Sequence, residues 1–395
     1  MIADFTIRAE EGHRDAERIR NWISARKNKR IVYLGLAIDD MRQYKSLCRD
    51  LSGITYDVLG LYFTVGMDSF AMPPDIKVRH FILTSMRCFT LRPSQLSKSL
   101  IDSLEVLDMT NVSFKKFKSV NRSQYSFSKL KVFALDCDGS SQQGLHTMKN
   151  FLALMPALKE FKISCDDSAN DDEKCIAPLV SFPTSLNTVT GFICDNVHAD
   201  LSHCKWPNLE ELRLYNAPRL GQWTGLTDKL RVVEIYNSYI GEEYDICKRD
   251  TLDKLKNVTL FALGNIQLTP VYRLFNEGFF DDAMPNLEML NVVSVETEVK
   301  ADAIKRFIER HPLIDTVFVE ESEELLNMTL PRDVEVFMKQ TPRGGFFDDA
   351  LGDLIHDVYG DAFNSDGFDY GMEDDYEDFD EWTDYDSYGE YDDDV

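Results

Sequence analysis

Hydrophobic side chains recur along most of this chain in one short phrase, with apolar residues at its first, fourth and sixth positions and polar residues between them. The clearest copies run from Ser103 to Phe114 and from Asn208 to Leu220. Alternation of apolar and polar positions is the period of a β-strand that buries one face. Copies start near Ile31, Tyr56, Val78, Leu104, Leu130, Leu158, Leu186, Leu209, Leu230, Leu255, Leu287 and Ile314. Each copy therefore predicts one short strand.

Successive copies are about 26 residues apart, which lies within the roughly 20–29 residues typical of leucine-rich repeats. A strand of this kind cannot bury its apolar face alone, so neighbouring copies must stack into one continuous core. We predict an α/β leucine-rich-repeat solenoid, shaped as a horseshoe of about twelve irregular repeats, over residues 31–340.

Both ends of the repeat region have helical patterns. Residues 1–30 predict a strand and a capping helix, with Asp15 as the N-cap and Ile19, Trp22 and Ile23 on the buried face. Residues 346–363 predict a second amphipathic helix. This helix either folds back over the last repeat or is offered to a groove on another protein, and the pattern leaves both alternatives open.

The C-terminal segment, residues 364–395, is strongly acidic and predicts disorder. The chain after Arg343 contains 20 acidic residues and no Lys or Arg, so this part accounts for most of the net charge of −25. Six aromatic residues recur at every third position: Tyr376, Phe379, Trp382, Tyr385, Tyr388 and Tyr391. This alternation suits capture of a basic protein, whereas a merely solubilising tail, or one that folds back on the chain's own basic segments, is the competing interpretation.

Charge and hydropathy exclude several classes of partner. The acidic tail argues against nucleic acid, because phosphate contacts need Lys and Arg. No stretch approaches the roughly 18 apolar residues of a membrane span, and the N-terminus lacks the apolar core of a signal peptide. We expect a cytoplasmic and/or nuclear protein, whose eight cysteines are reduced.

The third, fifth and seventh positions of each phrase predict the concave surface, because alternate strand residues face opposite sides. Four consecutive copies place an aromatic residue at the seventh position, and charged residues stand beside them. Such a row is the composition of a protein interface, although aromatic neighbours also stabilise a sheet without any ligand. The predicted partner-binding residues are Phe192, Glu211, Arg213, Tyr215, Glu234, Tyr236 and Phe261.

No catalytic pattern is present: we find no phosphate-binding glycine loop, nucleophile elbow or metalloprotease motif. Cys194, His198, His203 and Cys204 could in principle bind zinc, but adjacent ligands at 203 and 204 fit a tetrahedral ion poorly. We therefore expect no enzyme activity, no cofactor and no metal site.

The segment DAERIRNWISARKNKRIVYLGLAID, from Asp15 to Asp39, together with the phrases SLEVLDMTNVSF and KLKVFALDCD, resembles the repeat region of plant-type F-box/leucine-rich-repeat proteins. The resemblance covers about residues 4–340. It implies a substrate receptor of a cullin-type ubiquitin ligase, with ligase subunits as partners. No F-box is detectable before the Trp22 helix, since DFTIRA has a strand pattern.

The expected function is thus a non-enzymatic protein-interaction module, related to the recognition part of such receptors. The alternative is an acidic chaperone or escort of a basic protein, such as a histone or ribosomal protein, that uses the C-terminal tail. The two differ in their partners: one protein on the concave face, or a basic client on the tail.

Overall fold

A computed structural model describes most of the chain between residues 30 and 319 and parts of the N-terminal segment. The described residues are 2–7, 12–26, 30–66, 70, 72–117, 120–121, 125–138, 148–166, 179–181, 186–195, 197–200, 205–215, 227–236, 253–264, 278, 280–292, 300–319, 329 and 334–338. The predicted helix at 346–363 and the tail at 364–395, with its six aromatic residues, lie outside them.

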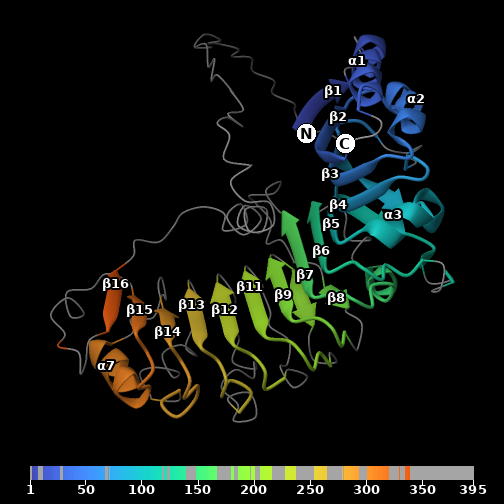
Figure 1. Ribbon diagram of the computed structural model, residues 1–395. Coiled ribbons are helices and arrows are strands. Elements are labelled where there is room, and N and C mark those ends of the chain that lie inside the picture. Colours follow the sequence, from blue (N-terminus) through green and yellow to red (C-terminus); the bar gives the residue numbers. More distant parts are fainter. Residues whose placement is uncertain are drawn as a thin grey trace, which may run out of the picture. The chain divides into compact units, whose positions relative to one another are not determined.

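Fourteen parallel strands form one sheet and follow one another across it in chain order, along an arc (Figure 1). They are β1 (Ile2–Ile7), β2 (Ile31–Ile38), β3 (Thr55–Phe63), β4 (Lys77–Leu91), β5 (Val106–Phe114), β6 (Val132–Asp138), β7 (Glu160–Asp166), β9 (Gly191–Asp195), β11 (Glu211–Tyr215), β12 (Val232–Tyr236), β13 (Leu260–Gly264), β14 (Met289–Val292), β15 (Thr316–Val319) and β16 (Glu335–Met338). The short strands β8 (Leu179–Ser181) and β10 (His198–Asp200) pair separately. The architecture is α/β, with one open parallel sheet.

Helices lie on the outer side of the arc (Figure 1). They are α1 (Gly12–Ser24), α2 (Met41–Leu51), α3 (Lys98–Ser103) and α7 (Ala301–Arg310), with a short 3-10 helix η1 (Pro93–Gln95). None of the described helices is long and apolar enough to cross a membrane.

The capping helix predicted within residues 1–30 is present as α1, but its predicted N-cap, Asp15, is wrong. The helix already begins at Gly12, so Asp15 lies in its first turn, where the carboxylate is 3.9 Å from Arg18. An acid in the first turn still favours the positive end of the helix dipole. Ile19 and Ile23 are buried as predicted, and Trp22 packs edge-on against Phe5 of β1.

The strand phrase predicted the register of most of the sheet. Ten of the twelve predicted starting residues align across neighbouring strands, as for Ile31, Tyr56 and Val78. The two exceptions are Leu186 and Leu255, where the aligned residues are Val189 and Val258, three positions later. In both copies an apolar residue stands at either place, so the pattern alone could not choose between them.

The residue three positions before the strand start turns out to have its own role. The start residue donates its N–H to the carbonyl of that earlier apolar residue, as Val189 does to Leu186 (3.4 Å) and Leu209 to Trp206 (3.2 Å). The same bond recurs in seven turns, from Leu130 to Ile314. Pro follows the accepting residue in four of these turns, at positions 156, 207, 285 and 312; the accepting residue is apolar in the first three and is His311 in the fourth. Proline suits this place because its fixed φ matches the first central position of a β-turn.

Each strand divides its side chains between two faces. The core face points to the outer layer of helices and turns and carries the buried rows, such as Leu107, Phe133, Phe161 and Phe192 along β5–β9. The alternate residues form the opposite face, on the inner side of the arc, which we call the open face. Polar side chains gather on the open face, so it is where a functional site has to be sought.

Candidate functional site

Three side chains on β11 and β12 form a connected polar group on the open face. The Tyr215 hydroxyl donates a hydrogen bond of 2.7 Å to Glu234 Oε2. Arg213 Nε lies 3.8 Å from the same oxygen, while its guanidinium also lies 3.5 Å from Glu211 Oε2. Nε is itself buried and makes no hydrogen bond with a described residue. Glu234 therefore holds Tyr215 in place and leaves one guanidinium donor unsatisfied.

Tyr236 extends this group across β13. Its ring stacks on that of Tyr215 with centroids 5.6 Å apart and planes 16° from parallel. Asn291 on β14 donates a hydrogen bond of 3.0 Å to the Tyr236 hydroxyl, although β13 lies between the two strands. The bond spans this distance because the intervening residue on the open face is the small Ala262. Five side chains, at 213, 215, 234, 236 and 291, form what we call the tyrosine network.

Burial and the charges within the tyrosine network determine the protonation of Tyr215, Tyr236 and Arg213. Burial, and then the charge of Glu234, raise the pKa of Tyr215, so that its hydroxyl remains a donor at any physiological pH. Burial and Glu234 also raise the pKa of Tyr236. Burial alone would lower the pKa of Arg213, but Glu234, Tyr215 and Glu211 outweigh it and raise that pKa. The network thus presents stacked phenols beside a permanent cation.

The predicted aromatic row is wrong at its two ends. Phe192 and Phe261 are fully buried on the core face, where they align with Leu212 and Val233. The residues that actually flank the two tyrosines on the open face are Asp195 and Gly264. The cause is the three-residue shift of these two copies, which moves each Phe from the seventh to the fourth position. The predicted residues Glu211, Arg213, Tyr215, Glu234 and Tyr236 do lie together on the open face.

Acidic side chains continue the open face toward β5. Asp136 on β6 accepts a hydrogen bond of 2.7 Å from the Ser164 hydroxyl on β7. Lys162 on β7 is buried and pairs with Glu160 at 3.1 Å. Asp108 on β5 makes no hydrogen bond or ion pair with a described residue, and burial, then Asp136, raise its pKa to about 6. We call Asp108, Asp136 and Ser164 the aspartate patch.

A buried histidine lies next to the aspartate patch. His80 on β4 is opposite Val106 on β5, and its parity places it on the open face, as that of Asp108 does. His80 is 4% exposed, and its Nε2 has no hydrogen-bond partner among the described residues. Burial lowers the pKa of His80 to about 4, so the ring is neutral at pH 7.

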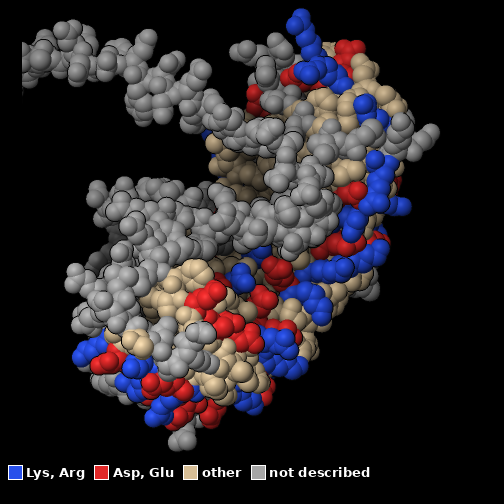
Figure 2. Space-filling view, turned by 60° about the vertical axis from the view of Figure 1, so that its left-hand side comes forward, with Lys and Arg blue, Asp and Glu red and all other residues tan. Residues whose placement is uncertain are grey.

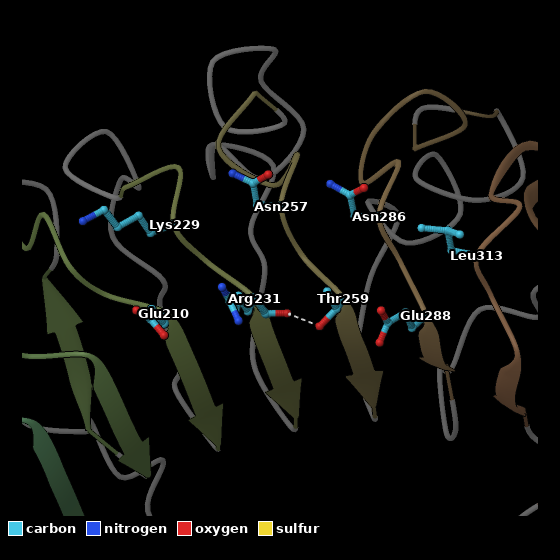
Figure 3. Close-up of a pocket in the computed structure, with 8 residues that line it drawn as sticks. All are labelled: Glu210, Lys229, Arg231, Asn257, Thr259, Asn286, Glu288 and Leu313. Carbon is cyan, nitrogen blue, oxygen red and sulfur yellow. Dashed lines mark hydrogen bonds between the residues drawn. The ribbon is translucent and has the colours of Figure 1, made fainter.

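A polar groove of about 500 Å³ crosses the starts of β11–β14 (Figure 3). One row of its lining stands on the turns and a second at the strand starts: Lys229, Asn257, Asn286 and Leu313, then Glu210, Arg231, Thr259 and Glu288. The Asn257 and Asn286 amides each donate to a carbonyl of the preceding turn, at 2.6 and 3.1 Å. These bonds tie one turn to the next. The groove is thus chiefly a result of how the turns stack.

Opposite charges also alternate along the starts of β2–β6. Asp57 pairs with Arg30 and lies 3.9 Å from Arg79, which in turn lies 3.2 Å from Glu105. Lys131 lies 3.6 Å from Glu105. Blue and red side chains are interleaved over the described surface in Figure 2. This edge is charge-balanced, which distinguishes it from the acidic open face.

The cysteine and histidine cluster at 194–204 is only partly described. The Cys194 thiol is fully buried and donates to the Val197 carbonyl at 3.4 Å, and burial raises its pKa, which disfavours a thiolate ligand. The side chain of His198, and all of His203 and Cys204, lie outside the described residues. Among the residues that are described, no three His, Cys, Asp or Glu side chains are grouped to hold a metal ion.

Sequence reasoning missed Asn291, because nothing in the pattern shows that a side chain bridges two strands. It also gave no role to His80, Asp108 and Lys162, although their third and fifth positions in the phrase were available as a signal. No protein-family model and no curated protein sequence matches this chain.

Proposed function

We propose that this chain is a leucine-rich-repeat protein-binding module, which holds a partner protein on its open face and acts without catalysis. The row of parallel strands, which bury their first, fourth and sixth positions against one core, supports the repeat assignment. A concave face of this kind offers a broad surface rather than an enclosed pocket.

The tyrosine network is the observation that carries the proposal. Tyr and Arg are enriched among the residues that dominate binding energy in protein interfaces. Tyr215 and Tyr236 are held by each other, by Glu234 and by Asn291 before any partner arrives. A prearranged surface loses less side-chain entropy on binding. Arg213, whose side chain is partly exposed, adds a permanent cation that a partner can contact.

The resemblance of residues 15–39 to F-box/leucine-rich-repeat proteins supports a narrower form of the proposal. In that form the chain is the recognition part of a ubiquitin-ligase receptor, and cullin and its adaptor are recovered with it. The escort function rests on the tail sequence alone and remains the second candidate.

Affinity capture from native cells, followed by mass spectrometry, tests the proposal with the full chain and the variant Tyr215→Ala/Tyr236→Ala. We expect at least about tenfold less of one or more specific partners, since two central anchors of an interface are lost. The matched control is Phe318→Ala/Phe337→Ala, which removes another stacked pair from the open face, at β15 and β16 (centroids 5.1 Å apart).

An unchanged set of partners in the tyrosine variant, with both variants folded by circular dichroism, would contradict the proposal. Recovery of cullin and adaptor would support the receptor form. Recovery of histones or ribosomal proteins only while the tail is present would favour the escort function instead.

A further inference from the structure

The open face has an excess of negative charge over β5–β12. Among the side chains that the structure describes on these strands, six carboxylates share the face with only two cations. The carboxylates are Asp108, Asp136, Glu160, Asp195, Glu211 and Glu234, and the cations are Lys162 and Arg213. Both cations already lie beside glutamates, Lys162 at 3.1 Å from Glu160 and Arg213 at 3.5 Å from Glu211.

Asp108 is a carboxylate whose ionised form is destabilised by burial and by the negative charge around it. Its neighbours are Asp136, which repels it, and Lys162, which attracts it but is engaged with Glu160. A desolvated carboxylate without a hydrogen-bonded counter-ion is unfavourable, and a cation brought by a ligand removes that penalty. The geometry therefore favours a positively charged ligand.

His80 is an independent sign of a ligand at the same place. It lies on the strand next to Asp108, diagonal to it on the open face, within the reach of long side chains across a strand pair. Its buried Nε2 has no hydrogen-bond partner among the residues of the structure, which is rare for a buried polar atom. In the tautomer protonated at Nδ1, the Nε2 atom is a hydrogen-bond acceptor, and a donor group of a ligand would satisfy it.

Resting on the proposed function, we propose that the aspartate patch and His80 receive an arginine or lysine side chain of the partner protein. A guanidinium has several N–H donors in one plane, enough for the two carboxylates and the histidine nitrogen together. A lysine ammonium group has the same charge but only three donors, which are not arranged in one plane. The partner is thus a protein that presents a basic segment to the open face beside the tyrosine network.

Fluorescence anisotropy of a labelled peptide, Gly-Ser-Arg-Gly-Ser-Arg-Gly, with the full chain tests this inference at about 150 mM salt, where weak surface attraction is screened. The comparison peptide replaces both arginines by citrulline, which has nearly the same shape but no charge. We expect Asp108→Asn/Asp136→Asn to weaken binding of the arginine peptide about tenfold, because charged hydrogen bonds are lost. The citrulline peptide should bind both proteins equally weakly.

The matched control is Asp282→Asn/Asp315→Asn, which removes the same charge from exposed turn residues and keeps the acidic tail. We expect this control to change affinity by less than about twofold. Equal affinity of both variants and the unchanged protein would overturn the inference, and would show that the tail or the general charge binds the peptide.

The tyrosine variant separates this inference from the proposed function. If Tyr215→Ala/Tyr236→Ala loses its native partners but binds the arginine peptide normally, the two surfaces act separately and both proposals hold. If Asp108→Asn/Asp136→Asn binds the peptide normally while the tyrosine variant loses its partners, only the basic-ligand inference fails.

Discussion

Asp108 makes the stability of the fold depend on pH in a direction opposite to that of most carboxylates. Its pKa is raised from the usual 3.8 to about 6 by burial and by Asp136. The folded chain therefore binds more protons than the unfolded chain between these two values, and stability falls as the pH rises through them. Above about pH 6 the full penalty of the buried charge remains.

Asp108→Asn should remove this penalty. We expect a gain of about 1–2 kcal/mol in the free energy of unfolding at neutral pH, which is below the ~3 kcal/mol of a two-unit shift because the side chain is only partly buried. The gain should shrink as the pH falls and vanish below about pH 4. Urea unfolding of both proteins at several pH values measures it, with Asp315→Asn as an exposed control. A gain that is the same at every pH would show that the carboxylate charge is not the cause.

The turn before each strand is the element that the sequence predicted least completely. Four turns carry Pro directly after the residue whose carbonyl accepts the turn's hydrogen bond, whereas the turn of Leu255 to Val258 carries Lys256 there. The Lys256 backbone N–H makes no hydrogen bond with a described residue that Pro would remove, and the Lys256 side chain forms an exposed pair with Asp228 at 2.9 Å. Pro at position 256 should lower the conformational entropy of the unfolded chain without straining the folded chain.

Lys256→Pro should raise the free energy of unfolding by about 0.4–1 kcal/mol relative to Lys256→Ala, which loses the same ion pair. Thermal and urea unfolding of the two variants measure the difference. A less stable Pro variant would mean that the backbone of this turn differs from those of Pro156, Pro207 and Pro285.

Most of the sheet could be predicted because its register depends on a local pattern, as at Ile31, Tyr56 and Val78. The predicted register was wrong where two apolar residues three positions apart gave two equally good strand starts. For this reason Phe192 and Phe261, predicted on the open face, are in the core. The bond from Asn291 to Tyr236 could not be predicted, since it depends on the small side chain of Ala262 on the strand between them. Partner identity leaves no local pattern at all.

Across the described sheet, each strand contacts chiefly its two neighbours. A destabilising substitution should therefore affect only the strands close to it. Phe133 on β6 is fully buried and packs against Phe114, Phe151 and Phe161 from adjoining segments. Strands are also longest in the first half, with 15 residues in β4 but 4 in β14. These features predict stability that varies along the sheet rather than one uniform value.

Phe133→Ala should cost about 3–5 kcal/mol locally, as a large buried ring is lost. Hydrogen exchange followed by mass spectrometry should show faster exchange in β5, β6 and β7 and little change in β14 and β15. Asn286→Ala, at a turn near β14, serves as the reciprocal control. Equal acceleration in every strand would mean that the described region unfolds as one cooperative unit.

The bridge from Tyr236 over Ala262 to Asn291 also restricts how such a chain can change its length. Deleting one complete unit, residues 233–260, would preserve the alternation of faces and let the remaining strands pair again, because Val232 and Leu260 occupy equivalent positions. The open face, however, would lose Tyr236 and bring Ala262 beside Arg213 in place of Glu234. Gain or loss of a whole unit therefore leaves the packing of the core nearly unchanged. It changes which side chains are neighbours on the open face, where a partner would bind.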